Sequence, residues 1–157
     1  MPDENNVQAF HEAQEAYVYQ KGKTFEEINI GDRASFAKTI TESDIYLYAG
    51  ISGDFNPVHV DEQYARTTPF KTRIAHGGLA GSLLAPVLGM KLPGLGTVAL
   101  EVTQKYRSAV YPGDTITCEV EVLKKLDRMK AVEMKVTWTN QEGKVVSKGT
   151  CRVLPPA

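Results

Sequence analysis

The sequence predicts an α+β domain in which a curved antiparallel sheet wraps around one long buried helix. An uncharged stretch from Gly77 to Met90 can form a helix that is apolar on every side. Four later segments alternate apolar and polar residues with the period of a strand. Turn-forming residues connect these segments, which is typical of antiparallel neighbours.

Length and composition narrow the classes of protein to which the chain can belong. With 157 residues, one domain with a substantial core is expected. A formal net charge of −1 gives no general reason to expect a nucleic acid or an anionic membrane as partner. The N-terminus lacks the apolar region of a secretory signal. The uncharged stretch is shorter than the roughly 20 residues of a membrane-spanning helix, so we expect a soluble protein.

The N-terminal part of the chain is predicted to contain an extension and a first strand. Residues 1–23 are expected to form the extension, with a helical stretch around Gln8–Tyr19, and residues 24–157 the single domain. Within the domain, Arg33–Ile40 alternates apolar and polar side chains, as in a strand with one buried face.

Two helices are expected after this strand. Thr41 is a candidate N-cap, and Asp44 three residues later makes a weak capping box. The helix should end at Gly53, because glycine readily adopts the left-handed conformation found at helix ends. Asp61 can cap a shorter helix that ends near Arg66.

The uncharged stretch from Gly77 to Met90 is predicted to be the buried helix. Leucine and valine cover most of its circumference, so the helix must be surrounded by protein. Pro86 should kink this helix or end its regular part.

The remaining segments can provide the surrounding sheet. Their alternation predicts one buried face and one solvated face, and they comprise residues 98–106, 116–122, 132–138 and 145–153. An antiparallel sheet curled around one apolar helix is the α+β arrangement called the hot-dog fold. Such a sheet leaves its edges incompletely covered, so a homodimer or an oligomer built from dimers is expected.

Asp54 and His59 are the residues whose pattern most clearly indicates chemistry. They lie five positions apart in a segment that is expected to be an irregular loop, since a glycine precedes it and a proline interrupts it. A carboxylate and an imidazole can act as general acid and base. The segment His76-Gly77-Gly78 follows at the start of the predicted buried helix. Together these residues indicate an enzyme.

These segments resemble the MaoC-like family of (R)-specific enoyl-CoA hydratases. The resemblance covers about residues 24–155, and its specific parts are Ser52–Asp61 and His76–Ser82. It implies a hot-dog dimer that adds water to a trans-2-enoyl-CoA to give an (R)-3-hydroxyacyl-CoA, or removes that water in the reverse direction.

The same resemblance implies roles for individual residues. Asp54 and His59 fall on the catalytic pair, Asn56 on a site-forming position, and Ser82 on a serine that lines or supports the site. The chemistry itself is consistent with these roles. A carboxylate and an imidazole can share one water and deliver its OH and H to the same face of the double bond. No cofactor is needed.

The start of the buried helix is expected to stabilise the negative charge that develops on the thioester oxygen. Backbone N–H groups of Gly77 or Gly78 can donate to this oxygen, helped by the helix dipole. Glycine allows the thioester to approach the backbone closely. His76 could cap the helix or pack near the mouth of the site, and we favour such a structural role.

Other interpretations of these residues carry less weight. An Asp before a proline often makes only loop hydrogen bonds, and a lone His is more often structural than catalytic. A metal site built from Asp54, His59, Asp61 and His76 can be imagined, but the spacing lacks the HxH or HExxH pattern of zinc sites. We therefore expect no metal.

The two cysteines, Cys118 and Cys151, fall on apolar positions of predicted strands. They have no CxxC spacing and no neighbouring ligand pattern. We expect reduced core residues, as in a cytoplasmic protein.

The substrate is expected to carry coenzyme A or acyl carrier protein as its handle. Either brings phosphates, for which the candidate partners are Arg66, Lys71, Arg73, Lys91 and Arg107. A short acyl chain, as in crotonyl-CoA, is the expected substrate, and a role in fatty-acid metabolism is compatible with this chemistry. Two alternatives stay open: a hot-dog acyl-CoA thioesterase and a non-catalytic acyl-CoA-binding module.

Overall fold

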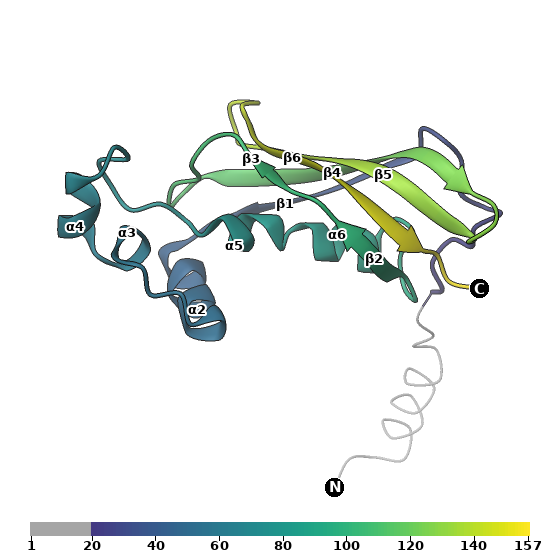
Figure 1. Ribbon diagram of the computed structural model, residues 1–157, viewed down its shortest axis with the longest axis horizontal. Helices are drawn as coiled ribbons and strands as arrows, with labels where there is room; N and C mark the ends of the chain where they lie inside the picture. The colour runs from purple at the N-terminus through teal and green to yellow at the C-terminus, as the bar shows by residue number, and fades with distance from the viewer. Residues whose placement is uncertain (1–19) are drawn as a thin grey trace, which may run out of the picture.

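The computed structural model describes residues 20–157 and shows a curled antiparallel sheet packed against helices (Figure 1). Its strands are β1 (Arg33–Thr39), β2 (Val98–Val102), β3 (Lys105–Tyr106), β4 (Thr115–Leu126), β5 (Ala131–Thr139) and β6 (Val145–Leu154). The strand order is β1-β4-β5-β6-β2, and β3 pairs with β6. The predicted α+β hot-dog architecture is confirmed.

Alternation in the central strands produces the core. In β4 the apolar residues Ile116, Cys118 and Val120 are buried, whereas the residues between them are partly or fully exposed. In β5 the side chain of Trp138 is fully buried, and Cys118 is its cross-strand partner in β4. Burial of the large apolar side chains of these strands on one face is the main source of stability in such a sheet.

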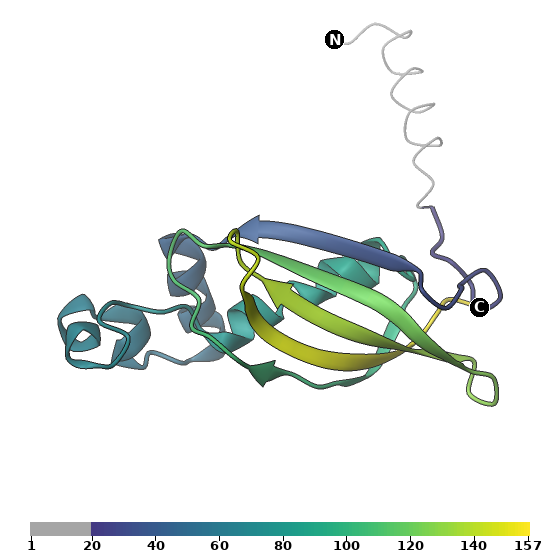
Figure 2. The same ribbon diagram turned by 90° about the horizontal axis from the view of Figure 1, so that it is seen from above.

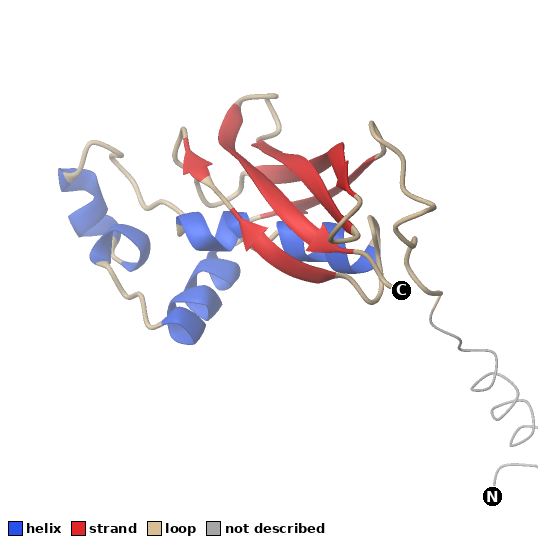
Figure 3. Ribbon diagram, turned by 45° about the vertical axis from the view of Figure 1, so that its right-hand side comes forward, coloured by secondary structure: helices blue, strands red, loops and turns tan. Residues whose placement is uncertain are grey.

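The helix beneath the sheet is divided into two parts. The sequence predicted one helix from Gly77 to Met90, but the structure has α5 (Gly77–Gly81) and α6 (Leu84–Met90) in succession (Figure 3). Pro86 has no N–H to donate to the carbonyl of Ser82, and its ring interferes with that carbonyl. The chain between the two helices therefore forms hydrogen bonds that span three residues instead of four, such as Ala85 N–H to Ser82 C=O at 3.0 Å.

The two helices also differ from the prediction in their exposure. Leu84, Val87 and Leu88 are buried against the sheet, but Ala85 and Met90 are exposed on the other side. Strand β2 likewise has no buried face in the single chain, although its sequence predicted one. Both exposed surfaces lack the covering that the sequence pattern anticipates.

Three helices form an arm that projects beyond the end of the sheet (Figure 2). They are α2 (Glu42–Ser52), α3 (Pro57–Val60) and α4 (Glu62–Thr67). The predicted caps are confirmed: Thr41 and Asp44 form a capping box, Gly53 ends α2 with φ 77°, and Asp61 accepts from the first N–H groups of α4. We call residues 42–67 the helical arm.

Residues 20–23 are the part of the predicted N-terminal extension that the structure describes. Its expected helical stretch, Gln8–Tyr19, lies outside the described residues. Gly22 and Lys23 donate backbone hydrogen bonds to Leu95 and Pro93, so these last residues of the extension pack on the domain. In the described part of the chain, no helix has both the length and the apolar character needed to cross a membrane.

The two cysteines lie in the core as free thiols, as predicted. Burial raises the pKa of both Cys118 and Cys151 to about 12, so neither is a ready thiolate nucleophile.

Candidate active site

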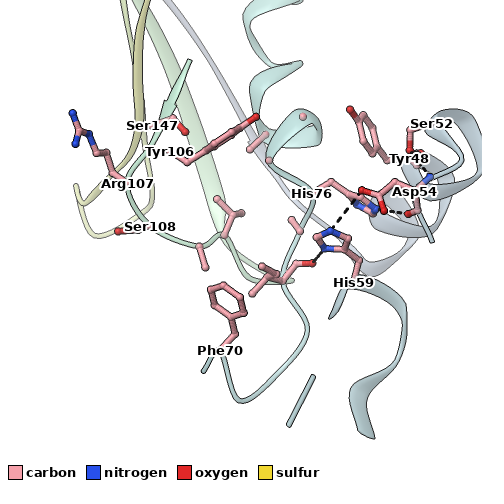
Figure 4. Close-up of a pocket in the computed structure, with 17 residues that line it drawn as sticks. Tyr48, Ser52, Asp54, His59, Phe70, His76, Tyr106, Arg107, Ser108 and Ser147 are labelled. Carbon is pink, nitrogen blue, oxygen red and sulfur yellow. Dashed lines mark hydrogen bonds and ion pairs between the residues drawn. The ribbon is translucent and has the colours of Figure 1, made fainter. Parts of the chain in front are cut away.

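A cavity of about 600 Å³ lies where the helical arm meets α5 and the sheet. Asp54 and His59 lie on one side of the cavity, and Tyr106, Arg107 and Ser147 on the opposite side (Figure 4). The segment that begins α5 lies between them. Cavities of this size are typical of small-molecule sites.

His59 is held firmly in a defined orientation. The sequence predicted an irregular loop here, but Pro57 begins α3 and His59 belongs to that helix. Proline is favoured at the first position of a helix, because its missing N–H has no partner there anyway. The ring nitrogen Nδ1 lies 2.8 Å from the carbonyl oxygen of Ile74. A carbonyl only accepts, so Nδ1 carries the hydrogen, and in the neutral ring Nε2 presents a lone pair.

Asp54 is held more loosely and faces this lone pair. It follows Gly53, the residue that ends α2. One carboxylate oxygen, Oδ1, accepts from the backbone N–H of Asn56 at 3.1 Å. The other, Oδ2, lies 3.9 Å from Nε2 of His59. The structure thus brings the two predicted catalytic residues together on the cavity wall.

His76 contacts both members of the pair. Its ring stacks on that of His59 with centroids 3.8 Å apart, and its Nε2 lies 2.9 Å from the backbone carbonyl oxygen of Asp54. The residue occupies the N-cap position of α5, but its side chain makes no capping hydrogen bond. Of the two structural roles expected for it, capping is therefore wrong, and packing beside the site is what the structure shows.

Asp54, His59 and His76 also bring potential metal ligands within 4.8 Å of one another. A metal ion bound by two imidazoles lies close to both ring planes at about 2 Å from each nitrogen. The His59 and His76 rings are stacked with an interplanar angle of 29°, an arrangement that is unfavourable for directing both in-plane lone pairs at one ion. The fourth residue of the imagined metal site, Asp61, instead caps α4. The geometry suits acid–base chemistry better than metal binding.

The two glycines at the start of α5 line the cavity beside the pair. Among residues 20–157, neither Gly77 N–H nor Gly78 N–H donates to a backbone carbonyl, as expected for the first turn of a helix. A Cβ atom at Gly77 would lie 2.5 Å from the ring of Tyr106, and one at Gly78 would lie 2.1 Å from the hydroxyl of Tyr48. Glycine is thus required for the tyrosine side chains to pack against the backbone here.

The two residues expected to support the site, Asn56 and Ser82, differ in whether they contact the catalytic pair. Asn56 shapes the loop: its side chain accepts from Val58 N–H and caps α3, and its own N–H bonds to Asp54. Ser82 donates instead to the carbonyl of Leu79 and does not line the cavity. Within the described chain, the Ser82 hydroxyl therefore bonds to the helix backbone and makes no contact with the Asp54–His59 pair.

The five candidate phosphate partners lie in different environments. Arg107 lines the cavity, whereas Arg73 is committed to the helical arm, where it contacts Glu42, Tyr46 and Glu62. The backbone N–H of Arg73, with its side chain, keeps the pKa of the Glu62 carboxyl below its ordinary value.

The other three candidates differ in how far they are engaged. Arg66 pairs with Glu62, and Lys91 donates to the carbonyl of Ser35. Lys71 is exposed and follows Phe70, which lines the cavity.

Residues 26–144 match the family described as MaoC like domain, and this range is well over half of the chain. The chain belongs to the MaoC-like family. The resemblance inferred from its two segments is confirmed.

Relatives of this MaoC-like chain include enzymes with named reactions. The (R)-specific enoyl-CoA hydratase of Rhodospirillum rubrum is 49% identical over 133 residues, which cover 85% of this chain and 92% of that protein. The 3-hydroxybutyryl-CoA dehydratase of Methylorubrum extorquens is 38% identical over 113 residues, 72% of each. The unliganded R-hydratase PhaJ1 from Pseudomonas aeruginosa has a TM-score of 0.81 at 41% identity and covers 86% of each chain.

Some residues of the MaoC-like site were not predicted from the sequence. Tyr48 lines the cavity from α2, and its place on the inner face of that helix was the available signal. Tyr106 and Ser147 come from β3 and β6, whose contact depends on how the sheet closes. No local pattern could place them beside Asp54.

Proposed function

We propose that the protein is a hydro-lyase that hydrates a trans-2-enoyl-CoA to the (R)-3-hydroxyacyl-CoA and catalyses the reverse dehydration. One observation carries this proposal most directly. The lone pair of His59 Nε2 and the carboxylate of Asp54 face each other at 3.9 Å on a cavity wall. This distance is too long for a direct hydrogen bond, but it allows one water molecule to donate to both groups. The relatives with named hydratase and dehydratase activities support the same conclusion.

The shared water supplies the OH group that is added to C3 and the hydrogen that replaces the one delivered to C2. Its oxygen forms the bond to C3 of the enoyl thioester while one of its hydrogens passes to the pair. The pair then delivers a proton to C2, so that OH and H are added to the same face and the enzyme returns to its initial state. General acid–base catalysis of this kind contributes typically ~10²–10⁴-fold to the rate.

The enolate that forms as the C3–O bond develops needs stabilisation at the thioester oxygen. We assign this role to the backbone N–H groups of Gly77 and Gly78, which lie on the cavity and have no backbone acceptor among the described residues. Preorganised backbone donors are effective for such developing charge. The reaction requires no cofactor.

The coenzyme A handle is proposed to lie on the side of the cavity that carries Arg107 and Phe70. Arg107 lines the cavity, and Lys71, the residue after Phe70 in the sequence, is exposed and is proposed as a second partner. Acyl carrier protein carries a phosphate on the same pantetheine arm and is the alternative carrier of the acyl group. Crotonyl-CoA, with its short chain, is the proposed test substrate.

Assembly as a homodimer is the further part of the proposal. Strand β2 pairs with β6 on one side only, and Val98, Leu100 and Val102 are all about half exposed. An exposed apolar edge strand with a free row of backbone groups is suited to pairing with another copy. The free thiols of Cys118 and Cys151 support a reducing, cytoplasmic location.

The decisive experiment follows crotonyl-CoA with two readouts in parallel. Loss of the enoyl-thioester absorbance without release of free thiol, giving the (R)-3-hydroxy product, is the expected result. Thiol release would assign the protein to the acyl-CoA thioesterases instead. Binding of crotonyl-CoA without turnover, also with longer enoyl chains and carrier-protein substrates, would favour the acyl-CoA-binding module.

A further inference from the structure

We propose that His76 is a positioning residue for the Asp54–His59 pair, which it holds through a hydrogen bond to the Asp54 backbone and through contact with the His59 ring. The inference rests on the catalytic roles proposed for Asp54 and His59. His76 itself makes no contact that the addition of water requires.

The hydrogen bonding of His76 defines its tautomer. The side chain is almost completely buried, with 2% of its surface exposed. Its Nε2 lies 2.9 Å from the carbonyl oxygen of Asp54, so Nε2 carries the hydrogen. Its Nδ1 is buried without a partner in the described structure. A second hydrogen on Nδ1 would be a buried donor without an acceptor, so the neutral Nε2–H tautomer fits this environment.

Two neighbouring aromatic rings also pack against the ring of His76. It stacks on His59 with a centroid distance of 3.8 Å and an interplanar angle of 29°. The ring of Tyr48 packs against it in a tilted arrangement, with the two ring centroids 5.0 Å apart. Figure 4 shows the imidazole between the Asp54 loop and the His59 ring. Movement of His76 would therefore release both members of the pair.

One short segment, Ile74–His76, holds the two catalytic groups at once. The Ile74 carbonyl orients His59, and the His76 side chain holds Asp54. The segment is itself anchored, because Ile74 N–H donates to Val58 C=O and Ala75 N–H to Val110 C=O. The 3.9 Å gap between the catalytic groups is thus set by contacts with this segment.

The Asp54 backbone has little else to hold it. Its N–H donates to the Ser52 hydroxyl at 3.2 Å, and its carbonyl accepts from His76. Asp54 follows Gly53 and is exposed. A shift of about 1 Å in a catalytic group can cost on the order of 10²-fold in rate, so loss of the His76 bond should reduce kcat.

Two substitutions in the full chain separate the hydrogen bond from the packing. His76→Phe keeps a flat ring but removes the donor, and His76→Gln keeps an amide N–H at about the position of Nε2 but removes the ring. With crotonyl-CoA, we expect His76→Phe to lower kcat roughly 10- to 100-fold with KM nearly unchanged. His76→Gln should recover the part of the lost kcat that depends on the hydrogen bond to Asp54.

Val136→Ala is the matched control for stability. Val136 is fully buried in β5 and does not line the cavity. This variant should lower Tm while keeping kcat, which shows that a loss of stability alone does not reproduce the kinetic effect. Wild-type kcat in His76→Phe, or equal impairment of His76→Phe and His76→Gln, would overturn the positioning role.

Asp54→Asn distinguishes a failure of this inference from a failure of the proposed function. If Asp54→Asn is inactive and His76→Phe is fully active, only the role of His76 is wrong. If Asp54→Asn turns over normally, the catalytic pair is wrong, and the positioning role fails with it.

Discussion

His59 and Asp54 differ in how firmly the protein holds them. The imidazole of His59 is buried, and a backbone carbonyl fixes its tautomer. The Asp54 side chain is 51% exposed, and a single backbone N–H restrains its Oδ1. The proposed base is therefore held more firmly than the solvated carboxylate opposite it, and the 3.9 Å between Nε2 and Oδ2 suits a single bridging water.

Replacement of Asp54 by Asn should remove catalysis without disturbing the fold. Asn retains an oxygen that can accept from Asn56 N–H, but it lacks the carboxylate. We expect kcat for crotonyl-CoA hydration to fall by ~10²–10⁴-fold and Tm to stay near that of the wild type. Asp61→Asn is the matched control, because Asn caps a helix about as well as Asp. Near-normal turnover by Asp54→Asn would remove this carboxylate from the mechanism.

Arg107 provides a test of where the coenzyme A phosphates bind. Its position on the cavity predicts that Arg107→Ala raises KM for crotonyl-CoA with little change in kcat. Crotonyl-pantetheine lacks the nucleotide phosphates, so its KM should be the same for variant and wild type. Lys91→Ala is the control, since Lys91 lies at the far end of α6. An equal rise in KM for both substrates would show that Arg107 does not contact phosphate.

At the scale of elements, two prolines explain where the sequence-based predictions succeed and fail. Pro57 contributes to the prediction of an irregular loop, yet it begins α3, because a proline is tolerated at the first helical position. Pro86 was expected to disturb the buried helix, and the chain does leave the α-helix at Ser82 and Leu83, a turn before this proline. The caps at Thr41, Gly53 and Asp61 were predictable, because capping depends on a few neighbouring residues.

The start of α5 offers a test of close packing at the site. A Cβ at Gly78 would lie 2.1 Å from the Tyr48 hydroxyl, so Gly78→Ala must displace a side chain that lines the cavity. We expect kcat/KM for crotonyl-CoA to fall about tenfold or more, although Ala is the better helix former.

Gly89→Ala is the matched control for this change. Nothing lies within 4 Å of the Cβ that it would add to α6. This variant should keep full activity and gain slightly in Tm, since Ala in a helix is favoured over Gly by about 1 kcal/mol. Equal activity of the Gly78→Ala and Gly89→Ala variants would show that the Tyr48 contact is unimportant.

At the scale of the whole molecule, the site depends on contacts that no local pattern reveals. Asp54 and His59 come from the helical arm, His76 from the connector before α5, and Tyr106 and Arg107 from β3 and the chain after it. The sequence identified the pair through its spacing and its family resemblance. It could not place the opposite wall, because that wall depends on the closure of the sheet.

The exposed edge of the sheet gives the last prediction. Leu100 in β2 is 45% exposed and lies on the strand whose outer edge is unpaired in the described chain. If β2 forms the proposed homodimer interface, Leu100→Glu places a charge there and should convert the protein from dimer to monomer. Leu123 in β4 is equally exposed, at 45%, but lies on an interior strand of the sheet, so Leu123→Glu should remain dimeric. Light scattering coupled to gel filtration measures both outcomes. A wild-type monomer, or a dimer that survives Leu100→Glu unchanged, would show that β2 is not the interface.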